Sequence, residues 1–133
     1  MDIQKISQFW KDSSEKDLKV AHDLLRLKHY PQCLFFGHLC LEKMLKAIIV
    51  KRTGTHALPI HDLIRLAKAA DLKLSESAER DFNTVSKFNV AARYQEEKYK
   101  MYKLATAAYA RKYFKFIERY YLWLKQEFQK KSE

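Results

Sequence analysis

The sequence predicts an all-α protein, and three features support this class. The chain holds only 2 glycines and 2 prolines, so it offers little turn chemistry. Hydrophobic residues make up 47% of it, and few of them fall in β-branched runs. Along most of the chain they recur at helical spacing. A length of 133 residues is sufficient for one buried core, so we expect a single domain over residues 1–133.

Two long helices are expected in the first half of the chain. The first runs from about residue 3 to 28 and ends before Pro31, since proline suits the first turn of a following helix. The second runs from about residue 31 to 52 and stops at Gly54, the residue type that most often ends a helix. Because the second helix is apolar around most of its circumference, it should lie at the centre of the fold.

Three further helices are expected after a loop over residues 53–60. A short one covers about residues 61–71. Ser75 has the side chain of an N-cap and begins a fourth helix, which ends near residue 92. The fifth helix is expected from about residue 96 to 129.

The apolar arc of the last helix approaches half its circumference, more than one bundle core requires. Phe114, Tyr121 and Phe128, spaced by seven, lie along one edge of this arc. Either the helix contacts several neighbours, or this aromatic edge forms a dimer interface, where Tyr and Phe are enriched. Both interpretations stay open at this stage.

A charged row crosses the apolar second helix. His38, Glu42 and Lys46 follow one another at intervals of four residues and therefore share one side of it. Buried helices seldom carry Glu and Lys, and burying a charge is costly unless it is paired. The structural interpretation is an internal Glu42–Lys46 ion pair with His38 nearby. The functional interpretation is a polar pocket between helices.

Further polar residues stand outside this row. Lys43 points away from it and either reaches solvent or contacts a phosphate. His61 opens the short third helix, as a cap or packing residue or as a base. Arg93 and Tyr94 stand between the last two helices, where Arg93 either holds a phosphate or pairs with Glu42 across the bundle.

The charge and the absent motifs narrow the function classes. A net charge of +10 favours nucleic acid, nucleotides or an acidic protein as partners, although no long basic run occurs. Cys33 and Cys40 lack metal-ligand spacing and are expected to be buried in a reducing compartment, and we expect no metal or cofactor. No apolar run is long enough to span a bilayer and no secretory signal is evident, so we expect a cytoplasmic protein without a membrane segment.

The segment DLKVAHDLLRLKHYPQCLFFGHLCLEKMLKAII, followed by HDLIRLAK and FNVAARY, resembles the HEPN domain family over about residues 13–124. The resemblance rests above all on three short clusters in the right order and spacing: Glu42-Lys43 with Lys46-Ala47, His61-Asp62-Leu63 and Ala92-Arg93-Tyr94. It implies an up-and-down bundle of four main helices with a short extra one, and a homodimer.

The resemblance also implies a class of function. Many HEPN domains are helical partners of minimal nucleotidyltransferases in toxin–antitoxin-like pairs, and this group is suggested to bind nucleotides. Others are metal-independent ribonucleases with a motif of Arg, four to six residues, then His. In this chain the matching positions after Arg93 hold Lys98, Tyr99 and Lys100, so the motif lacks its general acid or base. The family also often has proline after Arg-Tyr, where this chain has Gln95.

We therefore interpret the chain as a non-catalytic HEPN-type module that binds a nucleotide or phosphate. Lys43, Lys46 and Arg93 are the expected anion contacts, with His61 and Tyr94 as orienting residues. The first alternative is an RNA-binding protein or ribonuclease toxin. The second is an adaptor that binds another protein through its aromatic edge.

Overall fold

The computed structural model describes residues 2–131, with the backbone alone for residues 91 and 92, and every regular element in that range is helical. The prediction of an all-α fold is therefore confirmed. The helices are α1 (Ile3–Arg26), α2 (Tyr30–Thr53), α3 (Leu63–Ala69), α4 (Glu76–Arg93), α5 (Gln95–Leu104) and α6 (Ala107–Gln129). None of these helices is long and apolar enough to cross a membrane.

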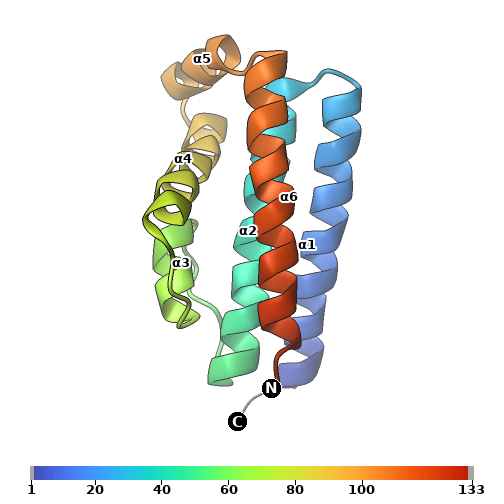
Figure 1. Ribbon diagram of the computed structural model, residues 1–133, viewed down its shortest axis with the longest axis vertical. Coiled ribbons are helices and arrows are strands. Elements are labelled where there is room, and N and C mark those ends of the chain that lie inside the picture. Colours follow the sequence, from blue (N-terminus) through green and yellow to red (C-terminus); the bar gives the residue numbers. More distant parts are fainter. Residues whose placement is uncertain (1, 132–133) are drawn as a thin grey trace.

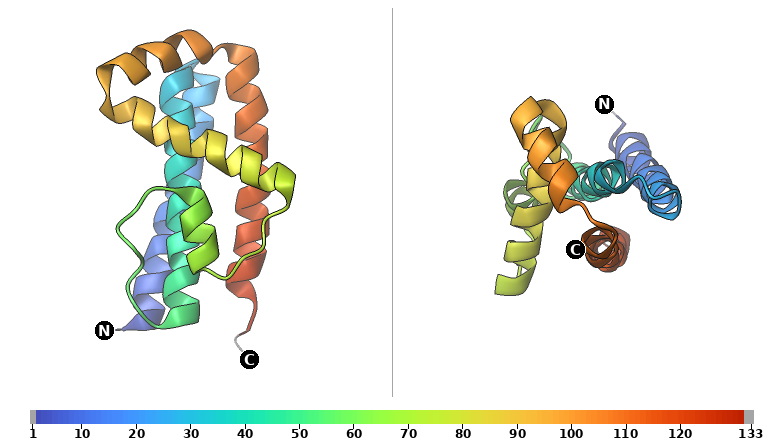
Figure 2. Two further views of the ribbon diagram at one scale, coloured as in Figure 1. Left: turned by 90° about the vertical axis from the view of Figure 1, so that its left-hand side faces the viewer. Right: turned by 90° about the horizontal axis from the view of Figure 1, so that it is seen from above.

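Helix α2 is the central element, as its apolar sequence predicts. It packs against α1, α3, α4 and α6. Figure 1 shows α1, α2 and α6 side by side along the long axis of the molecule, and Figure 2 shows α4 running obliquely past α2 on the other side. At its C-terminus, Gly54 adopts a φ of 70°, a left-handed conformation that glycine tolerates best, and ends the helix.

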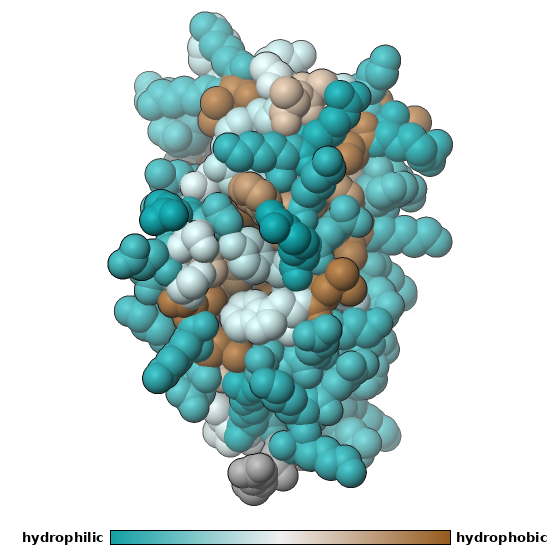
Figure 3. Space-filling view, viewed as in Figure 1, coloured by the Kyte–Doolittle hydropathy of each residue, from teal (hydrophilic) through white to brown (hydrophobic). Residues whose placement is uncertain are grey.

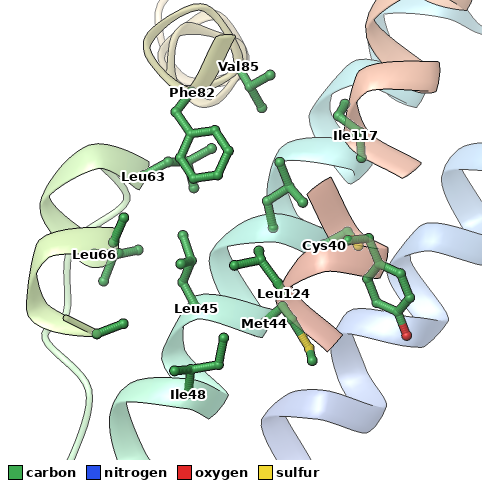
Figure 4. Close-up of a cluster of buried hydrophobic side chains, with 14 of the residues drawn as sticks. Cys40, Met44, Leu45, Ile48, Leu63, Leu66, Phe82, Val85, Ile117 and Leu124 are labelled. Carbon is green, nitrogen blue, oxygen red and sulfur yellow. The ribbon is translucent and has the colours of Figure 1, made fainter. Parts of the chain in front are cut away.

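The core is built from side chains of α2 and of three helices that pack on it, α3, α4 and α6 (Figure 4). Leu45 of α2, Leu66 of α3, Phe82 of α4 and Leu124 of α6 are all completely buried. A shared core of this kind fixes α3 and α4 against α2, and so places the loop before α3 and the end of α4 close to the charged row.

The last predicted helix is two helices in the structure. Thr106 interrupts it: its side-chain oxygen accepts a hydrogen bond from the Tyr109 amide at 3.2 Å and caps α6. Helix α5, which carries no buried residue, packs mainly on α4 and lies across one end of the bundle (Figure 1). The sequence offered no glycine or proline at this break, and a threonine within a helical pattern is a weak signal for one.

The aromatic edge of the last helix lies inside the protomer. Phe114, Tyr121 and Phe128 are 3%, 4% and 8% exposed. This corrects the sequence prediction that the three form a dimer interface, because they present almost no surface to a second copy. The alternative interpretation, a long helix that contacts several neighbours, accounts for the width of the stripe.

Both cysteines are buried, as predicted, and neither forms a disulfide. Burial raises the pKa of the Cys33 and Cys40 thiols to about 12 in both cases. A thiol that stays protonated is a poor nucleophile, so these residues act as small apolar side chains.

Candidate functional site

Two helices and a loop bring five polar side chains together, and we call this group the charged cluster. Its members are His38, Glu42 and Lys46 of α2, His61 of the loop before α3, and Arg93 at the end of α4. Glu42 and Lys46 form its buried part. The Lys46 ammonium donates to Glu42 Oε2 at 3.0 Å, and the two residues are 5% and 6% exposed. The ion pair that the row predicted is therefore present.

Trp10 of α1 covers the outer side of this pair. The Lys46 ammonium lies 5.4 Å from the centre of the indole ring, within range of a cation–π contact. The ring and the carboxylate together offset part of the cost of removing a lysine from water.

His61 connects the buried ion pair to Arg93 at the surface. Its Nδ1 lies 2.9 Å from Glu42 Oε1, and its Nε2 meets a guanidinium nitrogen of the exposed Arg93. Arginine has only donors, so His61 Nε2 must accept this hydrogen bond. The ring proton then sits on Nδ1 and is donated to Glu42. The imidazole is neutral in this arrangement, and Glu42 fixes its tautomer.

His38 helps to hold the His61 backbone in place. Its Nε2 donates to the His61 backbone carbonyl at 3.0 Å, and its side chain is completely buried. Its Nδ1 has no hydrogen-bond partner and lies 3.8 Å from Glu42 Oε1. Burial lowers the pKa of His38, because a charged imidazole would lose its hydration, so this ring stays neutral.

Opposing effects set the pKa of Glu42. Burial by itself would raise it, but the hydrogen bonds from His61 and Lys46 and the neighbouring charges together hold it below the ordinary value. Glu42 is therefore a carboxylate at neutral pH, and it can act as a fixed acceptor for His61.

The loop before α3 is held in place by two further contacts. Asp62 caps α3 by accepting hydrogen bonds from the amides of Ile64 at 2.9 Å and Arg65 at 3.2 Å. The Leu63 amide donates to the Ser86 hydroxyl of α4 at 3.0 Å. Because Asp62 caps the helix, His61 lies just outside it and its side chain is free to reach Glu42.

The predicted site residues separate into two groups. Lys46, His61 and Arg93 all lie in the charged cluster, whereas Lys43 lies outside it. Its ammonium pairs with Asp17 of α1 at 2.7 Å and donates to the Ser13 hydroxyl at 2.8 Å, so it links α1 to α2. Tyr94 follows Arg93 directly in the chain and is 61% exposed.

Two contributors escaped the sequence analysis. Trp10 lies 36 residues before Lys46, and nothing in its spacing links the two. Ser86 lies among the polar positions of α4 and carries no motif. Only the packing of α1 and α4 on α2 assigns these side chains to the cluster.

The arrangement offers an exposed cation beside a neutral, oriented imidazole, at the mouth of a buried ion pair. Such a pair can hold an anionic oxygen by charge-assisted hydrogen bonds, or it can transfer a proton. The part of the chain that the structure describes holds no group of three or more His, Cys, Asp or Glu side chains placed to bind a metal ion.

These features define the chain as an all-helical bundle domain with a buried charged cluster that opens at an Arg–His contact. The chain also matches the model of the HEPN domain over residues 7–127, and it therefore belongs to the HEPN family. This confirms the resemblance seen in the sequence, and it indicates a nucleotide- or RNA-related function. Comparisons with curated proteins and with solved structures gave no match.

Proposed function

We propose that this chain is a cytoplasmic, non-catalytic HEPN module that binds a nucleotide through its phosphates and serves a minimal nucleotidyltransferase in a toxin–antitoxin-like pair. The observation that carries the proposal is the contact between exposed Arg93 and His61 at the mouth of the charged cluster. Within residues 2–131, Arg93 forms no ion pair with a carboxylate and is linked to Glu42 through His61. A phosphate oxygen is the kind of partner that such a guanidinium accepts.

The roles within the site follow from exposure. Arg93 contacts the phosphate, and His61 Nε2, which accepts a hydrogen bond from Arg93, holds the guanidinium in place. Lys46 acts on the phosphate indirectly, because its ammonium donates its hydrogen bond to Glu42. We assign Tyr94, the exposed residue that follows Arg93 in the chain, as the residue that orients the rest of the ligand. The Asp17–Lys43 pair lies outside this site, so Lys43 is not among the contacts we now propose.

Titration calorimetry with ATP at low salt tests the proposal. We expect saturable binding that Arg93→Ala weakens by about tenfold or more, as the loss of a charge-assisted hydrogen bond predicts. Arg80→Ala is the matched control, because Arg80 is also exposed on α4 and its removal changes the net charge equally. Binding that both variants weaken alike would assign the effect to the general basic surface, and no binding by the wild type would refute the proposal.

One observation favours a second function, RNA cleavage. The chain lacks the Arg-x4–6-His spacing, yet Arg93 meets a histidine in space, and Glu42 orients that histidine in the manner of a general base. If the chain is a ribonuclease, His61→Asn and Arg93→Ala each abolish cleavage of a single-stranded RNA in the presence of EDTA. The non-catalytic proposal expects the RNA to remain intact after prolonged incubation.

We further propose that the chain forms a homodimer, because HEPN domains commonly dimerise. Light scattering should then give about twice the chain mass of 15.9 kDa. Co-purification with a nucleotidyltransferase encoded beside it would support the proposed partnership, and purification as a monomer without such a partner would oppose it.

A further inference from the structure

A groove along α6 has no role in the function proposed above. Its first part is a hollow of about 630 Å³ between α6 and the segment that leads into α4. The side chains that matter here are Lys73, Leu74 and Ala78 on one side and Phe116, Arg119 and Trp123 on the other. Its lining combines apolar surface with two cations at the rim.

A second hollow continues the first along α6. It shares Phe116 and Arg119 with it and adds Lys112, Lys115 and Leu122. We call the two together the α6 groove. From residue 112 to 123 it follows about 17 Å of helix. Figure 3 shows this face, with hydrophobic and intermediate side chains in brown and white between α4 and α6 and hydrophilic side chains in teal around them. An extended groove of this length suits a short peptide segment better than a small molecule.

The charge of the α6 groove is predominantly positive. Lys73, Lys112, Lys115 and Arg119 line it, and the ion pairs found within residues 2–131 involve other cations. Two acids also line it. Asp81 accepts a hydrogen bond from the Tyr120 hydroxyl at 2.6 Å, and Glu118 lies in the second hollow. The four cations thus outnumber the acids, and an acidic ligand complements them.

A cation of the groove already contacts one of its aromatic rings. The Arg119 guanidinium lies 5.0 Å from the Phe116 ring centre, within range of a cation–π contact. This contact leaves less of the Phe116 ring open for a base of a single-stranded nucleic acid to stack on. The cations keep outward donors for carboxylates, and Leu122 is 57% exposed beside them.

We propose that the α6 groove docks an acidic, amphipathic segment of another protein. An apolar side chain of the segment enters the hollow between Leu74 and Trp123, and its carboxylates meet Lys73 and Arg119. A second copy of this chain fits poorly, because a symmetric contact through the groove would set the same cations against each other at a net charge of +10 per chain. The inference does not depend on Arg93 or on nucleotide binding.

Peptide selection with the full-length protein tests this proposal. A displayed library of random peptides about 12 residues long, which as helices span roughly the length of the groove, is selected on the wild type. The selected peptides are then measured by fluorescence anisotropy against Lys73→Glu/Arg119→Glu. The matched control is Lys16→Glu/Lys19→Glu, which reverses two exposed charges on α1. Circular dichroism verifies that both variants are folded.

We expect the selected peptides to be rich in Asp, Glu and apolar residues. The groove variant should bind them about tenfold or more weakly than the wild type, and the control variant should bind them with nearly unchanged affinity. Trp123→Ala should weaken them as well, although it leaves the charge unaltered. Failure to enrich such peptides, or equal loss in both charge variants, would overturn the proposal. Two other results would also overturn the proposal. One is a short oligouridylate that displaces the selected peptides from the groove, and the other is self-association of the wild type that the groove variant abolishes.

Discussion

The charged cluster makes a quantitative prediction about the substitution Glu42→Gln. The change preserves the shape of the side chain, removes its negative charge and replaces one of its two acceptor oxygens with an NH2 donor. Lys46 then keeps an amide oxygen as hydrogen-bond acceptor but loses its counter-charge, while its side chain remains only 8% exposed. Two unit charges 3.0 Å apart attract one another by about 5 kcal/mol at an effective dielectric constant of about 20.

Not all of this attraction is lost, because the amide still accepts a hydrogen bond and the lysine can release its proton. Breaking one partner of a buried ion pair costs about 3–5 kcal/mol. We therefore expect Glu42→Gln to lower the free energy of unfolding by about 3 kcal/mol. Urea denaturation at pH 7, followed by tryptophan fluorescence and by circular dichroism, measures the change if the two transitions coincide.

Two further variants make this test specific. Glu97→Gln at the exposed Lys100–Glu97 pair is the control, and it should cost less than about 0.5 kcal/mol. Adding Lys46→Met to Glu42→Gln removes the uncompensated charge, so the double variant should recover part of the loss. A loss below about 1 kcal/mol for Glu42→Gln would show that the pair is solvated and would refute the buried network.

Three other substitutions test single features. His38→Gln keeps a donor near the His61 carbonyl but removes a buried imidazole whose pKa is lowered in the folded state. A folded protein with such a group becomes less stable as the pH falls below the pKa of the unfolded state, 6.5. In urea titrations, the wild type should therefore lose more stability than the variant between pH 7 and 5. Thr106→Ala removes the cap of α6 and should lower the unfolding free energy by about 1 kcal/mol, and no change would remove the reason given for the break. Gly54→Ala places a β-carbon at a φ of 70° with no clash nearby, so strain alone should cost about 1 kcal/mol by the same assay, and a stabilised variant would contradict that conformation.

The sequence predicted those parts of the fold that depend on local patterns. The central position of α2 followed from its apolar circumference, and its end followed from Gly54. Ser75 was correctly assigned as the cap of α4, where it accepts from the Ala78 amide. The division between α5 and α6 was missed, because a hydroxyl cap at Thr106 becomes visible only when the chain before it turns away. The burial of Phe128 likewise depends on which neighbour covers it.

The candidate site shows the same limit. Spacing alone placed His38, Glu42 and Lys46 on one side of α2, and it placed Lys43 elsewhere, since consecutive helical residues differ by about 100° in direction. The meeting of this row with His61 and Arg93 joins segments that are 19 and 51 residues away from Glu42 in the chain. No periodicity specifies such a meeting; it depends on α3 and α4 sharing one core with α2.

The balance of charges in the cluster explains why the anion contact that we propose lies at its exposed end. Glu42 is a carboxylate that Lys46 neutralises, and both imidazoles are neutral in the hydrogen-bond pattern observed. The cluster therefore carries one uncompensated positive charge, and that charge belongs to the exposed Arg93. The buried pair cannot attract an anion inward, because its charges cancel. What it can do is hold His61 in one tautomer, so that an anion arriving at Arg93 meets a guanidinium that the Nε2 acceptor already positions.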